Sequence, residues 1–199
     1  MQICIRQIDY QLHMSEELSD KELIERFKQE GQKQFAFGIL LKRYSRKVYW
    51  HVRRIVVNHD DADDVVQNTF IKVWEKLDEF REDSLLYTWI YRIATNEALG
   101  FLQKKKADRN VSMEEMQEQL GEQLEAGTYF NGNKAELILQ QAILTLPEKQ
   151  RLVFNMKYFE HMKYEEMEEV LGTSVGALKA SYHHAVKKIE IIVKNSLNH

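Results

Sequence analysis

The stretch from Asp61 to Lys106, DADDVVQNTFIKVWEKLDEFREDSLLYTWIYRIATNEALGFLQKKK, decides how this chain folds. In its first part, apolar residues recur with a period near 3.6, the spacing of one face of an α-helix: Ala62, Val65, Val66, Phe70, Val73, Trp74 and Leu77. Four aspartates, at positions 60, 61, 63 and 64, stand at its start, where negative side chains meet the positive end of the helix dipole. We therefore expect a helix whose first turn is acidic and whose apolar side is buried.

A second amphipathic helix is expected from about Leu86 to Lys106, with Trp89, Ile90, Ile93, Ala94 and Leu102 on its apolar face. Its three final lysines suit the negative end of a helix and are also able to meet phosphate. The polar loop between the two helices contains Phe80. This ring either fills the local core or is presented to a ligand, and the residue pattern somewhat favours the core.

The composition indicates an all-α fold made of two small helical domains. The 199 residues include one proline and only eight glycines, and helix formers dominate. Residues 15–107 carry 17 basic against 16 acidic side chains and residues 134–199 carry nine against eight, but residues 108–133 carry one against six. This shift predicts an N-terminal extension over 1–17, a helical domain over 18–107, a flexible acidic linker over 108–133 and a second domain over 134–199.

Several classes of protein are disfavoured by the residues that are missing. No apolar run approaches the length of a membrane span, and residues 1–14 do not have the pattern of a secretory signal. A single cysteine, Cys4, allows no internal disulfide and suits a reducing cytoplasm. The chain shows no Gly-rich phosphate loop, no nucleophile–histidine arrangement and no metal-ligand spacing. We therefore expect no enzyme activity, metal, cofactor or small-molecule substrate.

The C-terminal segment has the pattern of a helix-turn-helix. A short helix over 163–171 is followed by Gly172, Thr173 and Ser174, which predict a glycine stop and a serine cap, and then by a longer helix over 175–194. Four lysines against one glutamate lie between Lys179 and Lys194, so the second helix offers a locally basic surface. A helical hairpin inside a bundle is the simpler alternative, but this order favours DNA binding.

Nearly the whole chain after about residue 18 resembles a bacterial sigma factor of the extracytoplasmic-function (ECF) group. DADDVVQNTFIKVWEKL is similar to the region-two helix that grips the clamp helices of the polymerase β′ subunit, and FREDSLLYTWIYRIATNEALGFL to the segment that melts promoters. LPEKQRLVFNMKYFEHMKYEEMEEVLGTSVGALKASYHHAVKKI is similar to region four. The resemblance implies a promoter-specificity subunit that binds core RNA polymerase, including its β flap, and promoter DNA.

The resemblance also implies roles for particular residues. Polymerase-facing positions would be Asp64, Gln67 and Asn68. Positions around the minus-ten element would be Phe80, Arg81, Ser84, Asn96, Lys104, Lys105 and Lys106, with Trp89 packing behind them. Positions that read the minus-thirty-five element would be Lys179, Ser181, His183, His184 and Lys187. Ser181 and His184 depart from the family pattern, where arginine is frequent, so these positions lack the guanidinium that recognises guanine through two hydrogen bonds.

Two other functions compete with the sigma-factor interpretation. The first is a free-standing helix-turn-helix regulator, which would bind an operator tightly without polymerase. The net charge of −3 argues against it, because DNA affinity grows with the number of phosphates neutralised. The second is a helical interaction protein that does not contact DNA. Family members are often held by an anti-sigma factor, but no residue of this sequence identifies such a partner.

Overall fold

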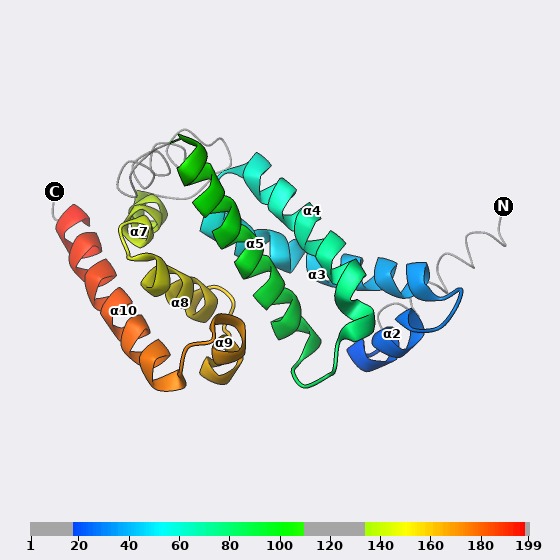
Figure 1. The fold of residues 1–199 in the computed structure, drawn as a ribbon. Helices are drawn as coiled ribbons and strands as arrows, with labels where there is room; N and C mark the ends of the chain where they lie inside the picture. The colour runs from blue at the N-terminus through cyan, green and yellow to red at the C-terminus, as the bar shows by residue number, and fades with distance from the viewer. Residues whose placement is uncertain (1–17, 110–133, 198–199) are drawn as a thin grey trace, which may run out of the picture.

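The computed structural model describes residues 18–109 and 134–197, and all regular structure in these two ranges is helical (Figure 1). The predicted all-α class is therefore confirmed. The expected N-terminal extension and nearly all of the expected linker lie outside the described residues. No helix within the described ranges is both long enough and apolar enough to cross a membrane.

The first helix, α2 (Asp20–Phe27), begins at a capping box. The Glu22 backbone N–H donates to Ser19 Oγ at 3.3 Å, and the Ser19 backbone N–H donates to Glu22 Oε2 at 2.7 Å. These two bonds satisfy donors that the helix itself leaves without partners. Leu23, Ile24 and Phe27 form the buried side of this short helix.

Replacing Ser19 with alanine is expected to lower the free energy of unfolding by about 1 kcal/mol, because an exposed N-cap is lost while the buried side of α2 is unchanged. Urea unfolding followed by circular dichroism measures this difference. Ser45→Ala, a serine replacement inside α3, is the matched control and should cause no loss. Equal losses in the two variants would contradict the capping role.

Three long helices form the core of the first unit: α3 (Lys33–Val56), α4 (His59–Lys76) and α5 (Leu86–Arg109). Each of them contacts the other two, and α2 closes one end against α3 (Figure 1). The α3–α4 turn is tight because Val57 adopts a positive φ of 65° and the Asn58 side chain caps α4 by accepting the Asp61 N–H at 3.0 Å. Helix α4 begins at His59, so its first turn contains Asp60 and Asp61, and the other two aspartates expected at the helix start lie in the next turn.

A short 3-10 turn, η1 (Leu77–Glu79), leads from α4 into the loop before α5. The apolar residues predicted on α4 are buried or pack on the core, and Trp74 meets the Phe27 and Phe37 rings edge to face at 5.2 and 5.0 Å. Such aromatic contacts add specific geometry to the burial of apolar area. Trp74 is therefore structural, as its place in the helical pattern predicts.

The second unit contains α7 (Lys134–Leu144), α8 (Glu148–Tyr158), α9 (Tyr164–Leu171) and α10 (Val175–Leu197). Helices α9 and α10 form the predicted helix-turn-helix. Gly172 ends α9 in a left-handed conformation, with φ at 61°, and its N–H donates to the Glu168 carbonyl at 2.8 Å. Glycine adopts this conformation without the steric cost that a Cβ imposes.

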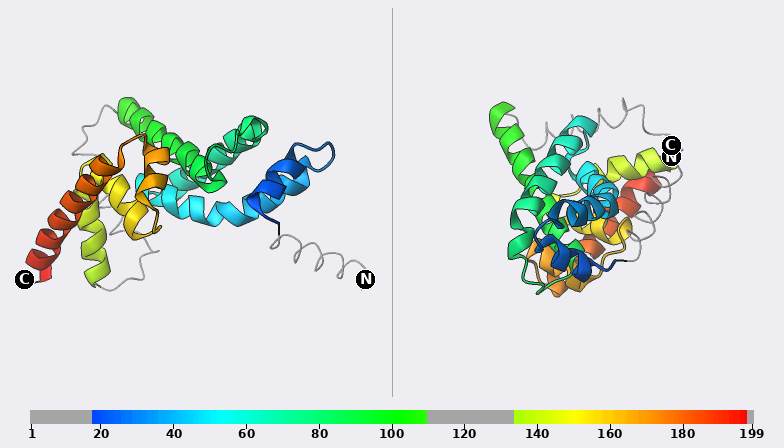
Figure 2. Two further views of the ribbon diagram at one scale, coloured as in Figure 1. Left: turned by 90° about the horizontal axis from the view of Figure 1, so that it is seen from below. Right: turned by 90° about the vertical axis from the view of Figure 1, so that its right-hand side faces the viewer.

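The two units are packed against each other. Helix α9 contacts α5, and α8 contacts α3. Figure 2 shows from two further directions that α9 lies beside α5, while α10 runs along the outer side of the second unit. Apolar residues of the second unit, among them Met156, Met167 and Leu178, belong to the same buried cluster as the core of the first unit. The arrangement described is therefore a closed one.

Candidate nucleic-acid and partner-protein interface

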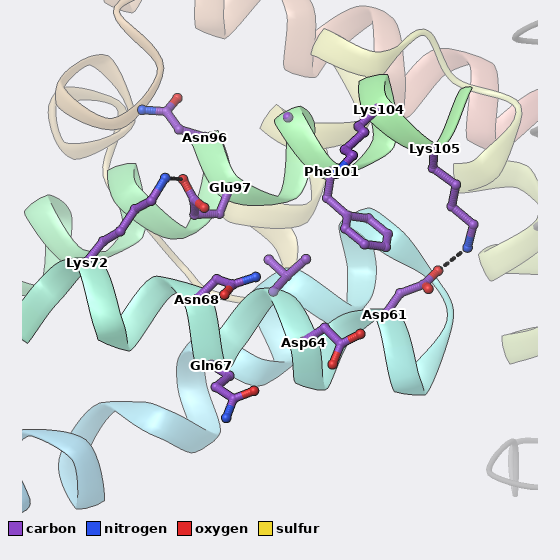
Figure 3. Close-up of a pocket in the computed structure, with 12 residues that line it drawn as sticks. Asp61, Asp64, Gln67, Asn68, Lys72, Asn96, Glu97, Phe101, Lys104 and Lys105 are labelled. Atoms are coloured by element: carbon purple, nitrogen blue, oxygen red, sulfur yellow. Dashed lines mark hydrogen bonds and ion pairs between the residues drawn. The ribbon is translucent and has the colours of Figure 1, made fainter. Parts of the chain in front are cut away.

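A groove of about 790 Å³ separates α4 from α5 (Figure 3). Helix α4 contributes Asp61, Asp64, Gln67, Asn68 and Lys72, and α5 contributes Asn96, Glu97, Phe101, Lys104 and Lys105. The structure thus brings together residues predicted for two different tasks, polymerase binding on α4 and minus-ten DNA on α5. Figure 3 shows the Asn96 amide projecting away from α4, whereas Lys105 reaches across the groove toward Asp61.

The outer face of α4 is exposed and largely polar. Asp64, Gln67 and Asn68 are all exposed, at the i, i+3 and i+4 spacing of one helix face. Ile71 continues this face and is half exposed, at 50%. A mixture of polar and apolar side chains such as this one is compatible with a protein-binding surface, which overall is about as apolar as the rest of a protein's surface. The predictions for this face omitted Ile71, although its spacing of seven residues from Asp64 is a signal that could have identified it.

Two ion pairs cross the groove. Lys72 Nζ lies 2.5 Å from Glu97 Oε1, and Lys105 pairs with Asp61. The Lys105 side chain is only 19% exposed, and its Asp61 partner 17%. In this conformation Lys105 is therefore held by a carboxylate and is not presented to DNA phosphate, unlike the prediction. Lys104 is exposed and Lys106 is half-buried, so Lys104 is the member of the lysine triplet that is most accessible.

Phe80 belongs to the core. Its side chain is 7% exposed, and its ring centroid lies 5.0 Å from that of Trp89. The predicted packing of Trp89 is also observed. The core alternative for Phe80 is confirmed, and the expectation that its ring contacts a base does not agree with its burial in this conformation. Burial between α5 and the loop leaves the ring no open face for stacking.

Of the other residues predicted for the minus-ten element, two lie in the loop before α5 and one lies on α5 itself. In the loop, Arg81 is exposed and Ser84 is half-buried, and Asn96 is exposed on the helix. Asn96 follows Trp89 by seven residues, which is two helical turns or about 10 Å along the same face. The loop that packs on Trp89 and the Asn96 amide therefore lie along a common surface of α5.

The second helix of the helix-turn-helix presents an exposed basic and imidazole surface. Lys179, His183 and Lys187 follow the i, i+4 spacing of a single face and are exposed, as is His184. Ser181 is half-buried and is less accessible than expected. The Lys179 ammonium lies 5.7 Å from the Tyr164 ring centroid, which positions this lysine beside the first helix of the motif. The second helix of a helix-turn-helix is the element that such proteins place in the DNA major groove.

Comparison with known families identifies both units. Residues 40–107 match the family model for sigma-70 region 2, and residues 136–189 match that for sigma-70 region 4. The ECF RNA polymerase sigma-E factor of Haemophilus influenzae is 32% identical over 187 residues, which cover 89% of this chain and 96% of that protein. The chain belongs to the ECF sigma factors.

Other relatives agree with this assignment. The ECF RNA polymerase sigma-E factor of Escherichia coli K12 is 34% identical to this sigma factor over 187 residues, which cover 89% of this chain and 95% of the relative. Among solved structures, CnrH in complex with the cytosolic domain of CnrY superposes with a TM-score of 0.65 at 24% identity, covering 88% of this chain and 97% of CnrH. The sigma factor RpoE in complex with the anti-sigma factor NepR, from Bartonella quintana, gives 0.63 at 20% identity, covering 79% and 96%. These two structures support the fold.

Proposed function

We propose that this sigma factor binds core RNA polymerase through the outer face of α4 and directs initiation at promoters with minus-ten and minus-thirty-five elements. The observation that carries the proposal is the exposure of Asp64, Gln67, Asn68 and Ile71 on one face of a helix whose other face is the core of the first unit. The expected receptor is the pair of clamp helices in the β′ subunit, with the β flap as a second contact for the C-terminal unit.

Promoter melting would use the exposed side of α5. Strand opening requires an unstacked base to be captured, which costs a few kcal/mol. The Asn96 amide offers both donors and an acceptor for a base edge, and it lies on the same surface as the Arg81–Ser84 loop. Because Phe80 is buried under this loop, we propose that it supports the loop and that the polar groups make the base contacts.

Recognition of the minus-thirty-five element would use α10. Lys179 and Lys187 supply positive charge for phosphates, and His183 and His184 supply ring nitrogens for base edges or phosphates. Neither histidine has the bidentate fork with which arginine recognises guanine. We therefore expect this sigma factor to discriminate among minus-thirty-five elements through contacts other than bidentate arginine–guanine hydrogen bonds.

Replacing Lys104 with alanine is expected to weaken promoter binding by the polymerase holoenzyme about equally on all sequences. Loss of one phosphate contact should reduce the slope of log affinity against log salt concentration by about 1. Fluorescence anisotropy at several salt concentrations measures this slope. The control is Lys76→Ala, an exposed lysine at the end of α4. A sequence-dependent loss would mean that Lys104 reads bases.

The closest competing function, a regulator that works without polymerase, makes a different prediction about the isolated protein. With a net charge of −3, the chain should bind DNA weakly alone and gain affinity only with core enzyme. A mobility-shift assay at physiological salt, with and without core polymerase, distinguishes the two. Tight, specific binding by the isolated protein would favour the regulator.

The same proposal implies a site of action and the absence of catalysis. A subunit that recruits polymerase to promoters acts in the cytoplasm, where polymerase meets DNA, and it needs no catalytic groups of its own. The structural relatives in complex with CnrY and with NepR also make an anti-sigma partner a reasonable proposal for this chain. Co-purification of an inhibitory partner from the native cell would test that part directly.

A further inference from the structure

A buried polar contact joins the two units of this sigma factor. Glu160 lies in the turn between α8 and α9, and its side chain is 9% exposed. Its Oε1 lies 2.9 Å from Nδ1 of His51 and 3.8 Å from Nη1 of Arg54, both on α3. The neighbouring Phe159 ring lies 4.4 Å from the Arg54 guanidinium carbon. Two consecutive residues of region four are thus inserted against region two.

His51 is itself held in place from the other side. Its Nε2 lies 2.8 Å from Thr95 Oγ1 on α5, and the ring is 1% exposed. Burial lowers the pKa of the Arg54 guanidinium, and the Glu160 carboxylate acts in the opposite direction. Glu160 therefore meets an imidazole and a guanidinium that are partly or wholly removed from water and are already oriented by region two.

Helix α9 makes a second contact with α5. The Thr88 hydroxyl lies 2.9 Å from Glu169 Oε2, and Thr88 is 1% exposed. Burial, followed by a hydrogen bond with Glu166, raises the pKa of Tyr87. Met167 and Val170 of α9 are buried in the shared apolar cluster. Carboxylates of region four thus flank an apolar seam over the first turns of α5, while Asn96 remains exposed farther along.

The Glu160 contact favours one arrangement without making it very stable. The second carboxylate oxygen, Oε2, is buried and has no hydrogen-bond partner. The desolvation free energy of a buried carboxylate with one unpaired oxygen cancels much of the free energy gained from its ion pairs. A contact of this kind therefore determines geometry more than it adds net stability. Removal of one partner, however, leaves the other charge buried and uncompensated.

In the closed arrangement, the surfaces proposed to bind the two promoter elements lie too close together to engage both elements at once. Helix α10 packs on α9, which packs on α5, and packed helix axes lie about 8–10 Å apart, so the reading face of α10 is roughly 20–25 Å from α5. Elements centred near positions minus ten and minus thirty-five are about 25 base pairs apart, or roughly 85 Å at 3.4 Å per base pair. Both elements can be bound at once only after the units separate.

We propose that Glu160, inserted between His51 and Arg54, is the latch that holds the two units of this sigma factor in the closed arrangement, where they cannot reach both promoter elements. The proposal rests on the proposed function, since the closed arrangement matters only if both promoter elements must be reached. A latch of this kind reduces the apparent affinity for core polymerase by the fraction of molecules that are open. Weakening it should raise that affinity without changing either binding surface.

Pulsed dipolar electron spin resonance on the full chain tests the latch. Nitroxides are attached at Lys42→Cys and Lys188→Cys, two exposed positions on α3 and α10, in a Cys4→Ser background. Without a latch substitution we expect one narrow distribution of distances. Glu160→Gln, which keeps the shape but removes the charge, should raise the open-to-closed ratio about tenfold, and Glu160→Lys, which adds repulsion from Arg54, should raise it further. Glu168→Lys, an exposed charge reversal on α9, should leave the distribution unchanged.

The latch is overturned if the labelled parent is already widely distributed, or if Glu160→Gln retains the parent distribution. Circular dichroism separates opening from misfolding in the Lys variant, and the isosteric Gln variant decides the question if Lys does not fold. In parallel, core polymerase titrated against the same proteins should bind Glu160→Gln about tenfold more tightly than the parent. Absence of polymerase binding by every variant would reject the proposed function, whereas the distance distributions would still decide the latch.

Discussion

Reversal of the charge at Asp64, by Asp64→Lys, is expected to weaken binding to core RNA polymerase about 100-fold. Asp64 is exposed on the outer face of α4, beside Gln67 and Asn68, and takes no part in the core. A new ammonium at the centre of this polar interface leaves the polymerase groups that would meet the carboxylate without a partner, and it repels any of them that are positively charged. Together these effects reduce the binding free energy by about 2.8 kcal/mol. Biolayer interferometry with immobilised core enzyme measures the change.

The matched control is Asp63→Lys on the same helix. Asp63 is also exposed, but its direction differs by about 100° around the helix axis, and its carboxylate lies 3.6 Å from His59. We expect its effect on polymerase affinity to be less than threefold, a margin that corresponds to roughly 0.6 kcal/mol. Similar losses in the two variants would show that the acidity of α4 matters generally and that no specific face is recognised.

The second large effect is expected at Asn96. Asn96→Ala should slow formation of the open promoter complex about 10- to 100-fold, while affinity for core polymerase stays the same. The amide is exposed on α5 and takes no part in the core, and a bidentate amide–base contact is worth about 1–3 kcal/mol. Potassium permanganate reactivity of unpaired thymines, followed over time, measures the opening rate.

A control for this prediction is Gln34→Ala, which removes an exposed amide from α3. It should alter neither opening nor polymerase binding. A premelted promoter offers a further check, because a residue that captures an unstacked base should matter less when part of the opening cost has been removed. If Asn96→Ala instead reduces polymerase affinity, this side of α5 belongs to the polymerase interface.

Local patterns in the sequence were sufficient for the helices and the turns. The glycine stop at Gly172 and the apolar stripe of α4 depend on neighbours within a few residues, and both are observed. Helix ends that depend on backbone geometry were less predictable. Helix α3 ends at Val56 because the next residue takes a positive φ, which no side-chain pattern at this position indicates.

Contacts between distant parts of the chain were not predictable in the same way. Lys105 was expected on DNA but pairs with Asp61, 44 residues earlier. The latch residue Glu160 meets His51 across 109 positions, and nothing near Glu160 in the sequence distinguishes it from other surface carboxylates. Phe80 shows the intermediate case: an aromatic residue in a polar loop left two possibilities open, and only its packing on Trp89 decided between them.

Reconstituted transcription tests the central claim most directly. Purified chain and core RNA polymerase are combined on a fragment library of the native genome, and transcript starts are mapped by sequencing. The account predicts discrete new start sites, absent with core enzyme alone, that share elements near positions minus ten and minus thirty-five and are reduced by Asp64→Lys. An unchanged set of starts with a correctly folded chain would contradict it.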